Sequence, residues 1–88
     1  MNNRIYDERY KQFRQSVLDR DKHCQFPGCK KRVRLQVHHI IRWADSGEFR
    51  YNPTNGIALC TKHHKLVSGK EHLYMQLFFD IVRAKYGK

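Results

Sequence analysis

Residues 55–64 have the sequence Asn-Gly-Ile-Ala-Leu-Cys-Thr-Lys-His-His, and this stretch decides the fold. The apolar residues in its middle predict a short β-strand that ends at Cys60. Thr61 can then cap a helix, which we expect over residues 62–69. Cys60 and His63 therefore lie three positions apart, where a strand passes into a helix.

A second pair of possible metal ligands lies upstream, in Cys24-Gln25-Phe26-Pro27-Gly28-Cys29. The Pro-Gly step predicts a tight turn that brings the two thiols together. With Cys60 and His63 they form a set of four soft or borderline ligands, which suits tetrahedral zinc. The sequence therefore predicts a structural zinc site. The alternative is that some of these cysteines are buried core residues without a metal.

The composition places limits on the kind of protein. The chain has 88 residues, which predicts one small domain over 1–88. A domain this small needs further stabilisation beyond its apolar core, such as a structural metal. Three cysteines, an odd number, favour metal binding in a reducing compartment over disulfides. Eighteen Lys and Arg against eight Asp and Glu give a net charge of +10, which favours a nucleic acid partner. No apolar run reaches the roughly 18 residues of a membrane span, and no signal peptide is visible, so we expect a cytoplasmic protein without a membrane partner.

Helices are expected on both sides of the central motif. A helix over 7–21, capped by Asp7, is predicted by apolar residues at helical spacing, Tyr6, Tyr10, Phe13 and Val17. A second amphipathic helix over 71–86 is predicted by Leu73, Leu77, Ile81 and Val82, with Phe78 beside them. We expect its apolar stripe to be a core face or a dimer face.

Alternation of apolar and polar residues from Val33 predicts another strand, which ends in His38-His39-Ile40-Ile41. Neighbours on a strand point to opposite faces, so the two histidines should have different functions. Residues 42–54 are expected to form a long connection with turns at Asp45-Ser46-Gly47 and Asn52-Pro53. Trp43 within it is interpreted as a packing anchor in preference to a base-stacking residue.

Taken in order, these motifs resemble the HNH endonuclease family, above all its zinc-knuckle branch from bacteria and phages. The resemblance covers about residues 17–69 and is carried by Arg20-Asp21-Lys22-His23-Cys24, Cys29, His38-His39-Ile40-Ile41-Arg42-Trp43-Ala44-Asp45-Ser46-Gly47, and Asn55 through His64. It implies a small α+β fold with a ββα-metal motif, in which a two-stranded hairpin and a helix surround a catalytic divalent ion. The structural zinc site and the helices about 7–21 and 71–86 would flank this motif.

The resemblance also implies roles for single residues. His38 and His64 would bind the catalytic ion, and His39 would be the general base that takes a proton from water. Asn55 cannot titrate, so we expect it to hold the His39 loop by hydrogen bonds; the alternative is a plain turn residue. A site of two histidines completed by water accepts Mg²⁺, Mn²⁺, Ni²⁺ or Zn²⁺.

The chain departs from the family pattern at Ser68. Many relatives have a histidine here, four residues after His64, as a further metal ligand. Water, His72 or the substrate phosphate can take its place. The second knuckle also has His63 where much of the family has a cysteine, and both suit zinc.

The leading hypothesis is a metal-dependent DNA endonuclease that hydrolyses phosphodiester bonds by a one-metal, histidine general-base mechanism. One alternative is a non-catalytic, zinc-stabilised DNA-binding module, and another is a basic adaptor that binds proteins through its C-terminal helix. His39 favours the nuclease, since a binding module has no use for a spare imidazole beside a metal ligand. DNA is the expected partner in a bacterial or phage-infected cell, and a homodimer or a larger phage or restriction complex is left open.

Overall fold

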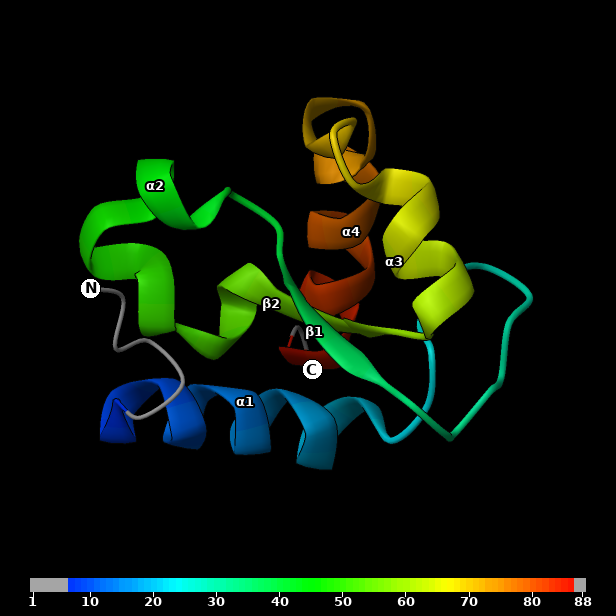
Figure 1. Cartoon of the computed structure of the whole chain (residues 1–88), viewed down its shortest axis with the longest axis horizontal. Helices are drawn as coiled ribbons and strands as arrows, with labels where there is room; N and C mark the ends of the chain where they lie inside the picture. Colours follow the sequence, from blue (N-terminus) through cyan, green and yellow to red (C-terminus); the bar gives the residue numbers. More distant parts are fainter. Residues whose placement is uncertain (1–6, 87–88) are drawn as a thin grey trace.

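The computed structural model of the chain describes residues 7–86. Its elements, in chain order, are α1 (Glu8–Asp21), β1 (Gln36–His39), α2 (Trp43–Ser46), the 3-10 helices η2 (Gly47–Tyr51) and η3 (Pro53–Asn55), β2 (Gly56–Leu59), α3 (Thr61–Val67) and α4 (Glu71–Tyr86). This is a small α+β fold. Figure 1 shows the β1–β2 hairpin at its centre, with α1 along one side and α3 and α4 on the other. Among the described helices, none has both the length and the apolar composition that crossing a bilayer requires.

The hairpin is antiparallel, with Gln36 opposite Leu59 and His39 opposite Gly56. All four residues of β2 are buried. Because side chains alternate along a strand, β2 contributes to two apolar clusters. Ala58 packs with Phe13 and Val17 of α1. Ile57 and Leu59 belong to a cluster with residues of α3 and α4, among them Val67, Phe78 and Val82.

Helix α1 has the predicted bounds and the predicted cap. The side chain of Asp7 accepts a hydrogen bond from the backbone N–H of Arg9 at 2.8 Å, and Phe13 and Val17 are buried. Tyr6, which the apolar pattern also included, lies outside the described residues.

A buried ion pair that the sequence analysis did not foresee fixes α1 to the hairpin. The carboxylate of Asp21 is fully buried and accepts hydrogen bonds from Arg20 and from the backbone N–H of Ala58 at 2.9 Å. Arg20 in turn donates to the backbone carbonyls of Pro53 and Gly56. The close approach of α1 also depends on Gly56, where a Cβ would lie 2.7 Å from a ring carbon of Phe13.

Both strands are shorter than predicted. The first begins at Gln36 instead of Val33, because Arg34 has a positive φ of 55° that ends the extended run, and Val33 is 68% exposed. Cys60 is not a strand residue but occupies the N-cap position of α3. The expected cap by Thr61 is therefore wrong, since Thr61 is already the first helical residue, and α3 ends at Val67.

The predicted apolar stripe of α4 forms a core face only in part, although the helix has the predicted bounds. Leu73 is 66% exposed and Leu77 38% exposed, whereas Phe78 and Val82 are buried against the hairpin side of the core. Apolar residues occupy several faces of this helix, so the way it docks decides which of them are buried.

The connection over residues 42–54 is more regular than expected, since it contains α2, η2 and most of η3. Trp43 packs edge-on against the rings of His39 and Tyr51, and the guanidinium of Arg50 lies 4.2 Å from its ring centre. These contacts agree with a packing anchor that stiffens the segment after β1.

Candidate metal centres and active site

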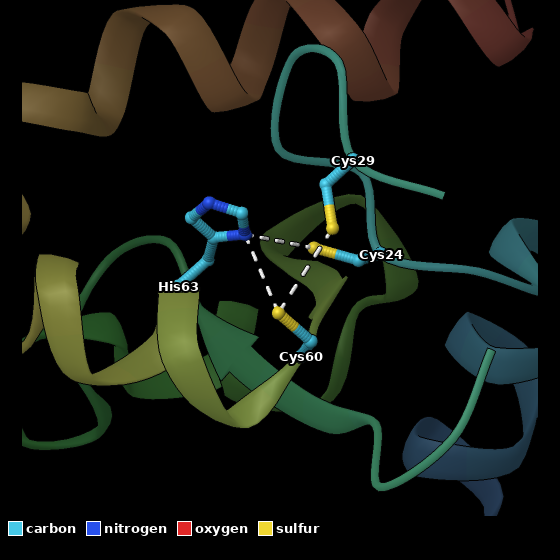
Figure 2. Close-up of side chains that lie close together, drawn as sticks. All are labelled: Cys24, Cys29, Cys60 and His63. Carbon is cyan, nitrogen blue, oxygen red and sulfur yellow. Dashed lines mark hydrogen bonds between the residues drawn. The ribbon is translucent and has the colours of Figure 1, made fainter. Parts of the chain in front are cut away.

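The four predicted zinc ligands come together in the structure. One ligand atom from each of four residues lies within 4.8 Å of the others, the four residues being Cys24, Cys29, Cys60 and His63. Figure 2 shows the two pairs facing each other, Cys24 and Cys29 from the loop after α1, Cys60 and His63 from the start of α3. Residues separated by more than thirty positions therefore form one group, which we call the Cys/His cluster.

Local structure explains how each pair is formed. Gly28 has a φ of +84°, which allows the turn in which the N–H of Cys29 donates to the carbonyl of Phe26 at 2.9 Å. The ring of Phe26 then stacks on the imidazole of His63, with 4.2 Å between ring centres. The predicted Pro-Gly turn is thus present, and it also supports the histidine of the other pair.

The distances fit a tetrahedral ion. Nδ1 of His63 lies 3.3 Å from the sulfur of Cys60 and 3.6 Å from that of Cys24, and the sulfurs of Cys29 and Cys60 are 4.0 Å apart. Ligands on a tetrahedral zinc would be roughly 3.6–3.8 Å apart. Burial raises the pKa of the Cys24 thiol to about 11, so a cation is needed to hold this sulfur as a thiolate. The Cys/His cluster can therefore bind zinc.

Three other histidines, His38, His39 and His64, line an open hollow of about 570 Å³ at the end of the hairpin. We call it the histidine hollow. Its walls come from β1, α1, α2 and the beginning of α3 and α4, and the lining residues are Tyr10, Val37, His38, His39, Arg42, Trp43, Ala44, His64 and Glu71. Three of the four residues proposed for catalysis thus lie around one space.

His38 is the most deeply buried of these histidines, with 5% of its surface exposed. Among residues 7–86, its Nε2 is the one buried side-chain nitrogen or oxygen without a hydrogen-bond partner. Its ring lies edge-on to that of His64, with 5.8 Å between ring centres. Burial lowers the pKa of His38 to about 4, and repulsion from His64 adds to this effect. His38 is therefore neutral near pH 7 and has a buried ring nitrogen without a hydrogen-bond partner, which are properties that suit a metal ligand.

His39 occupies a different environment, as the alternation of strand residues predicts. Its ring stacks on Phe13 of α1, with 4.7 Å between ring centres. Its Nε2 lies 3.0 Å from the backbone carbonyl of Arg50. A carbonyl can only accept, so Nε2 carries the proton and Nδ1 carries the lone pair of the neutral ring.

Asn55 does not line the hollow but lies completely buried behind the end of β1. Its Oδ1 accepts from the N–H of Ile41 at 2.8 Å, and its Nδ2 donates to the carbonyl of Ile41 at 3.2 Å. Its own carbonyl accepts from Ile40 at 2.9 Å. Asn55 also ends η3, so the turn interpretation and the hydrogen-bonding interpretation both describe it.

The Cys/His cluster and the histidine hollow meet on α3, where His63 belongs to the cluster and its neighbour His64 lines the hollow. Successive helical residues are about 100° apart around the axis. One turn of helix therefore presents an imidazole to each group. The pKa of His64 is lowered by burial, while the charge of Glu71 opposes the shift.

The residues near the position where relatives have a third histidine ligand lie in different places. Ser68 is the C-cap residue of α3, and its hydroxyl donates to the carbonyl of His64 at 2.8 Å. His72 is exposed and lines a neighbouring hollow of about 310 Å³ with Asp45 and Met75. Glu71, which the sequence analysis did not consider, lines the histidine hollow itself.

Comparison with known proteins places this chain in a family. The model of the HNH endonuclease family matches residues 24–67, which is half of the chain. The chain therefore belongs to the HNH endonuclease family, as the sequence motifs predict. This membership implies a nuclease function with DNA as the substrate. No curated protein and no solved structure matches the chain.

Proposed function

We propose that this protein is a metal-dependent endonuclease that hydrolyses DNA phosphodiester bonds with His39 as the general base. The observation that carries the proposal is that His38, His39 and His64 reach the same open hollow from β1 and α3. Family membership supports DNA as the substrate, and the net charge of +10 favours binding of its backbone.

His38 and His64 are the side chains that would hold the catalytic divalent ion. The buried Nε2 of His38 has no hydrogen-bond partner among the described residues, and His64 lies beside it. Two neutral imidazoles leave several coordination positions for water and phosphate oxygens. When bound, the ion would stabilise negative charge on the phosphate and on the leaving oxygen.

His39 is suited to take the proton of the attacking water. Its Nε2–H is held by the carbonyl of Arg50, so Nδ1 is the atom that accepts the proton. The water oxygen forms a bond to phosphorus, its proton passes to Nδ1, and the bond from phosphorus to the 3′ oxygen breaks. Stacking on Phe13 keeps the imidazole plane fixed during this transfer.

Asn55 acts as a positioning residue in this proposal. Its two hydrogen bonds to Ile41 fix the backbone just after the histidine pair, where β1 leaves the hairpin. A buried side chain with both amide groups satisfied holds one conformation, so the His39 ring keeps its direction.

A plasmid assay tests the function. The chain is purified with one zinc bound and incubated with supercoiled plasmid and Mg²⁺, Mn²⁺, Ni²⁺ or Zn²⁺ in turn. We expect at least one ion to support conversion to open-circular or linear DNA, and an exposed-histidine control, His72→Ala, to retain this activity. Tight DNA binding without cleavage under any of the four ions would favour the zinc-stabilised DNA-binding module instead.

A further inference from the structure

The histidine hollow contains an acidic side chain that the proposed function does not use. Glu71 is the first residue of α4 and is half-buried at the wall that also carries His38 and His64. It reaches this place because Gly69, with a φ of +81°, reverses the chain between α3 and α4. The turn thus brings a carboxylate to the hollow only seven positions after His64.

The Glu71 carboxylate is stabilised mainly by backbone N–H groups, with smaller contributions from the charges of His38 and Arg42. Its Oε2 accepts the backbone N–H of Gly69 at 3.1 Å. Its own backbone N–H and that of Gly69 lower the pKa of Glu71. Arg42, the one Lys or Arg that lines the histidine hollow, pairs with Asp45 at 2.8 Å, and no salt bridge engages Glu71 within the described part of the chain. A carboxylate has about four lone-pair sites, so two N–H contacts leave it able to accept a cation.

We propose that Glu71 is the third protein ligand of the divalent ion in the histidine hollow. It would take the place of the additional histidine that many relatives have at the position of Ser68. This inference rests on the proposed function of His38 and His64. Glu71 borders both hollows, whereas the other candidate side chain, His72, is exposed and lines the neighbouring hollow but not the histidine hollow. The hydroxyl of Ser68 donates to the carbonyl of His64 within α3. Glu71 is therefore the wall residue with a ligand atom of the right chemistry.

The three side chains surround the hollow more widely than the Cys/His cluster, which is the only group in residues 7–86 whose ligand atoms all lie within 4.8 Å. A glutamate has three rotatable side-chain bonds, so its carboxylate can approach an ion without a change of backbone. Two imidazoles and one carboxylate favour Mn²⁺ more than two imidazoles alone, because oxygen ligands suit Mn²⁺ and imidazole suits Ni²⁺.

The test is a titration of Mn²⁺ and Ni²⁺ into the full, zinc-loaded chain without DNA, followed by calorimetry. Glu71→Gln keeps the size of the side chain and removes its charge. Loss of a ligand should weaken binding at least as much as loss of a residue that only supports a ligand, so we expect Mn²⁺ affinity to fall about tenfold or more. Ni²⁺ affinity should fall less. Glu8→Gln is the matched control, since Glu8 is the acidic first-turn residue of α1, and it should change neither affinity more than about twofold.

Each result has a definite meaning. A Glu71→Gln affinity for Mn²⁺ within about twofold of wild type, or an equal loss in Glu8→Gln, would overturn the assignment. If the wild-type chain binds neither ion, both the ligand and the proposed catalytic site are wrong. If Glu71→Gln loses Mn²⁺ while wild type cleaves no plasmid, the ligand assignment stands and the nuclease function fails. Normal cleavage with unchanged Mn²⁺ binding in Glu71→Gln removes only Glu71.

Discussion

The Cys/His cluster and the histidine hollow are built from similar ligands but have opposite shapes. In the cluster, the four atoms that would bind a metal all lie within 4.8 Å of one another, and two of the three cysteines are buried. In the hollow, the ring centres of His38 and His64 are 5.8 Å apart, and the two rings border a space of about 570 Å³. Four close protein ligands complete a tetrahedral ion, whereas a few ligands around a space leave positions for water and substrate. In the proposed function, the Cys/His cluster would therefore stabilise the fold, and the histidine hollow would hold the reaction.

The largest expected effect on stability comes from removing one ligand of the Cys/His cluster. In Cys29→Ser, zinc content should fall from about one ion per chain towards zero, because three ligands hold the ion less well than four. The melting temperature should fall on the order of 20 °C, since folding of so small a domain depends on the metal. Metal analysis and thermal unfolding measure both quantities. Unchanged melting would mean that the Cys/His cluster is only a group of buried thiols.

A substitution in the histidine hollow should instead reduce activity and leave zinc content and stability nearly unchanged. In His39→Ala, cleavage should slow by about a hundredfold or more, because a general base is lost. Zinc content should stay the same, and melting should change only by the lost contact with Phe13. His39→Gln preserves more of the side-chain volume and should be equally slow. Cleavage within a few-fold of wild type in both variants would exclude His39 as the base.

A change behind the open site should affect both stability and activity. Asn55→Ala leaves the partly buried N–H and carbonyl of Ile41 without their side-chain partners, which should cost about 3 kcal/mol of unfolding free energy. Cleavage should also fall while zinc is retained. Asn52→Ala is the matched control, because Asn52 is an exposed cap of η3, and it should cost about 1 kcal/mol with little effect on cleavage. Equal losses of stability in the two variants would contradict the role of Asn55.

The smallest expected effect comes from a substitution that disturbs only the packing of α1 against the hairpin. Gly56→Ala places a Cβ 2.7 Å from Phe13 and Val17, so α1 must shift, at a cost of about 2 kcal/mol. Because Phe13 stacks on His39, cleavage should fall more than zinc content. In a Val17→Ala background the added methyl group has more room, so the same substitution should cost less. Chemical denaturation of wild type, Gly56→Ala, Val17→Ala and the double variant measures the difference in unfolding free energy.

Local patterns predicted the parts of the molecule that local chemistry determines. The Pro-Gly turn between Cys24 and Cys29, the junction at Cys60 and the opposite environments of His38 and His39 follow from turn preferences, ligand types and strand alternation. The bounds of α1 follow from its cap and its periodicity, and those of α4 from apolar residues that recur at helical spacing.

What the sequence analysis missed depends on how distant segments dock. Leu73 and Phe78 are both apolar, and only the contact with the hairpin decides that Phe78 is buried. The buried Asp21 depends on Arg20 and on an N–H of β2. Glu71 escaped notice because it follows a turn, where helical spacing from His64 no longer applies. A check of every acidic residue within one turn of the missing ligand would have found it.

The neighbouring positions of His63 and His64 make chelator experiments ambiguous for this protein. In the proposed function, a chelator that strips both ions would abolish cleavage for two reasons, because α3 supplies His63 to the Cys/His cluster and the next residue, His64, to the histidine hollow. Adding back Mn²⁺ or Mg²⁺ restores activity only if zinc has stayed in place. The time course of inactivation should therefore have a fast, reversible phase and a slow phase that only zinc followed by refolding reverses.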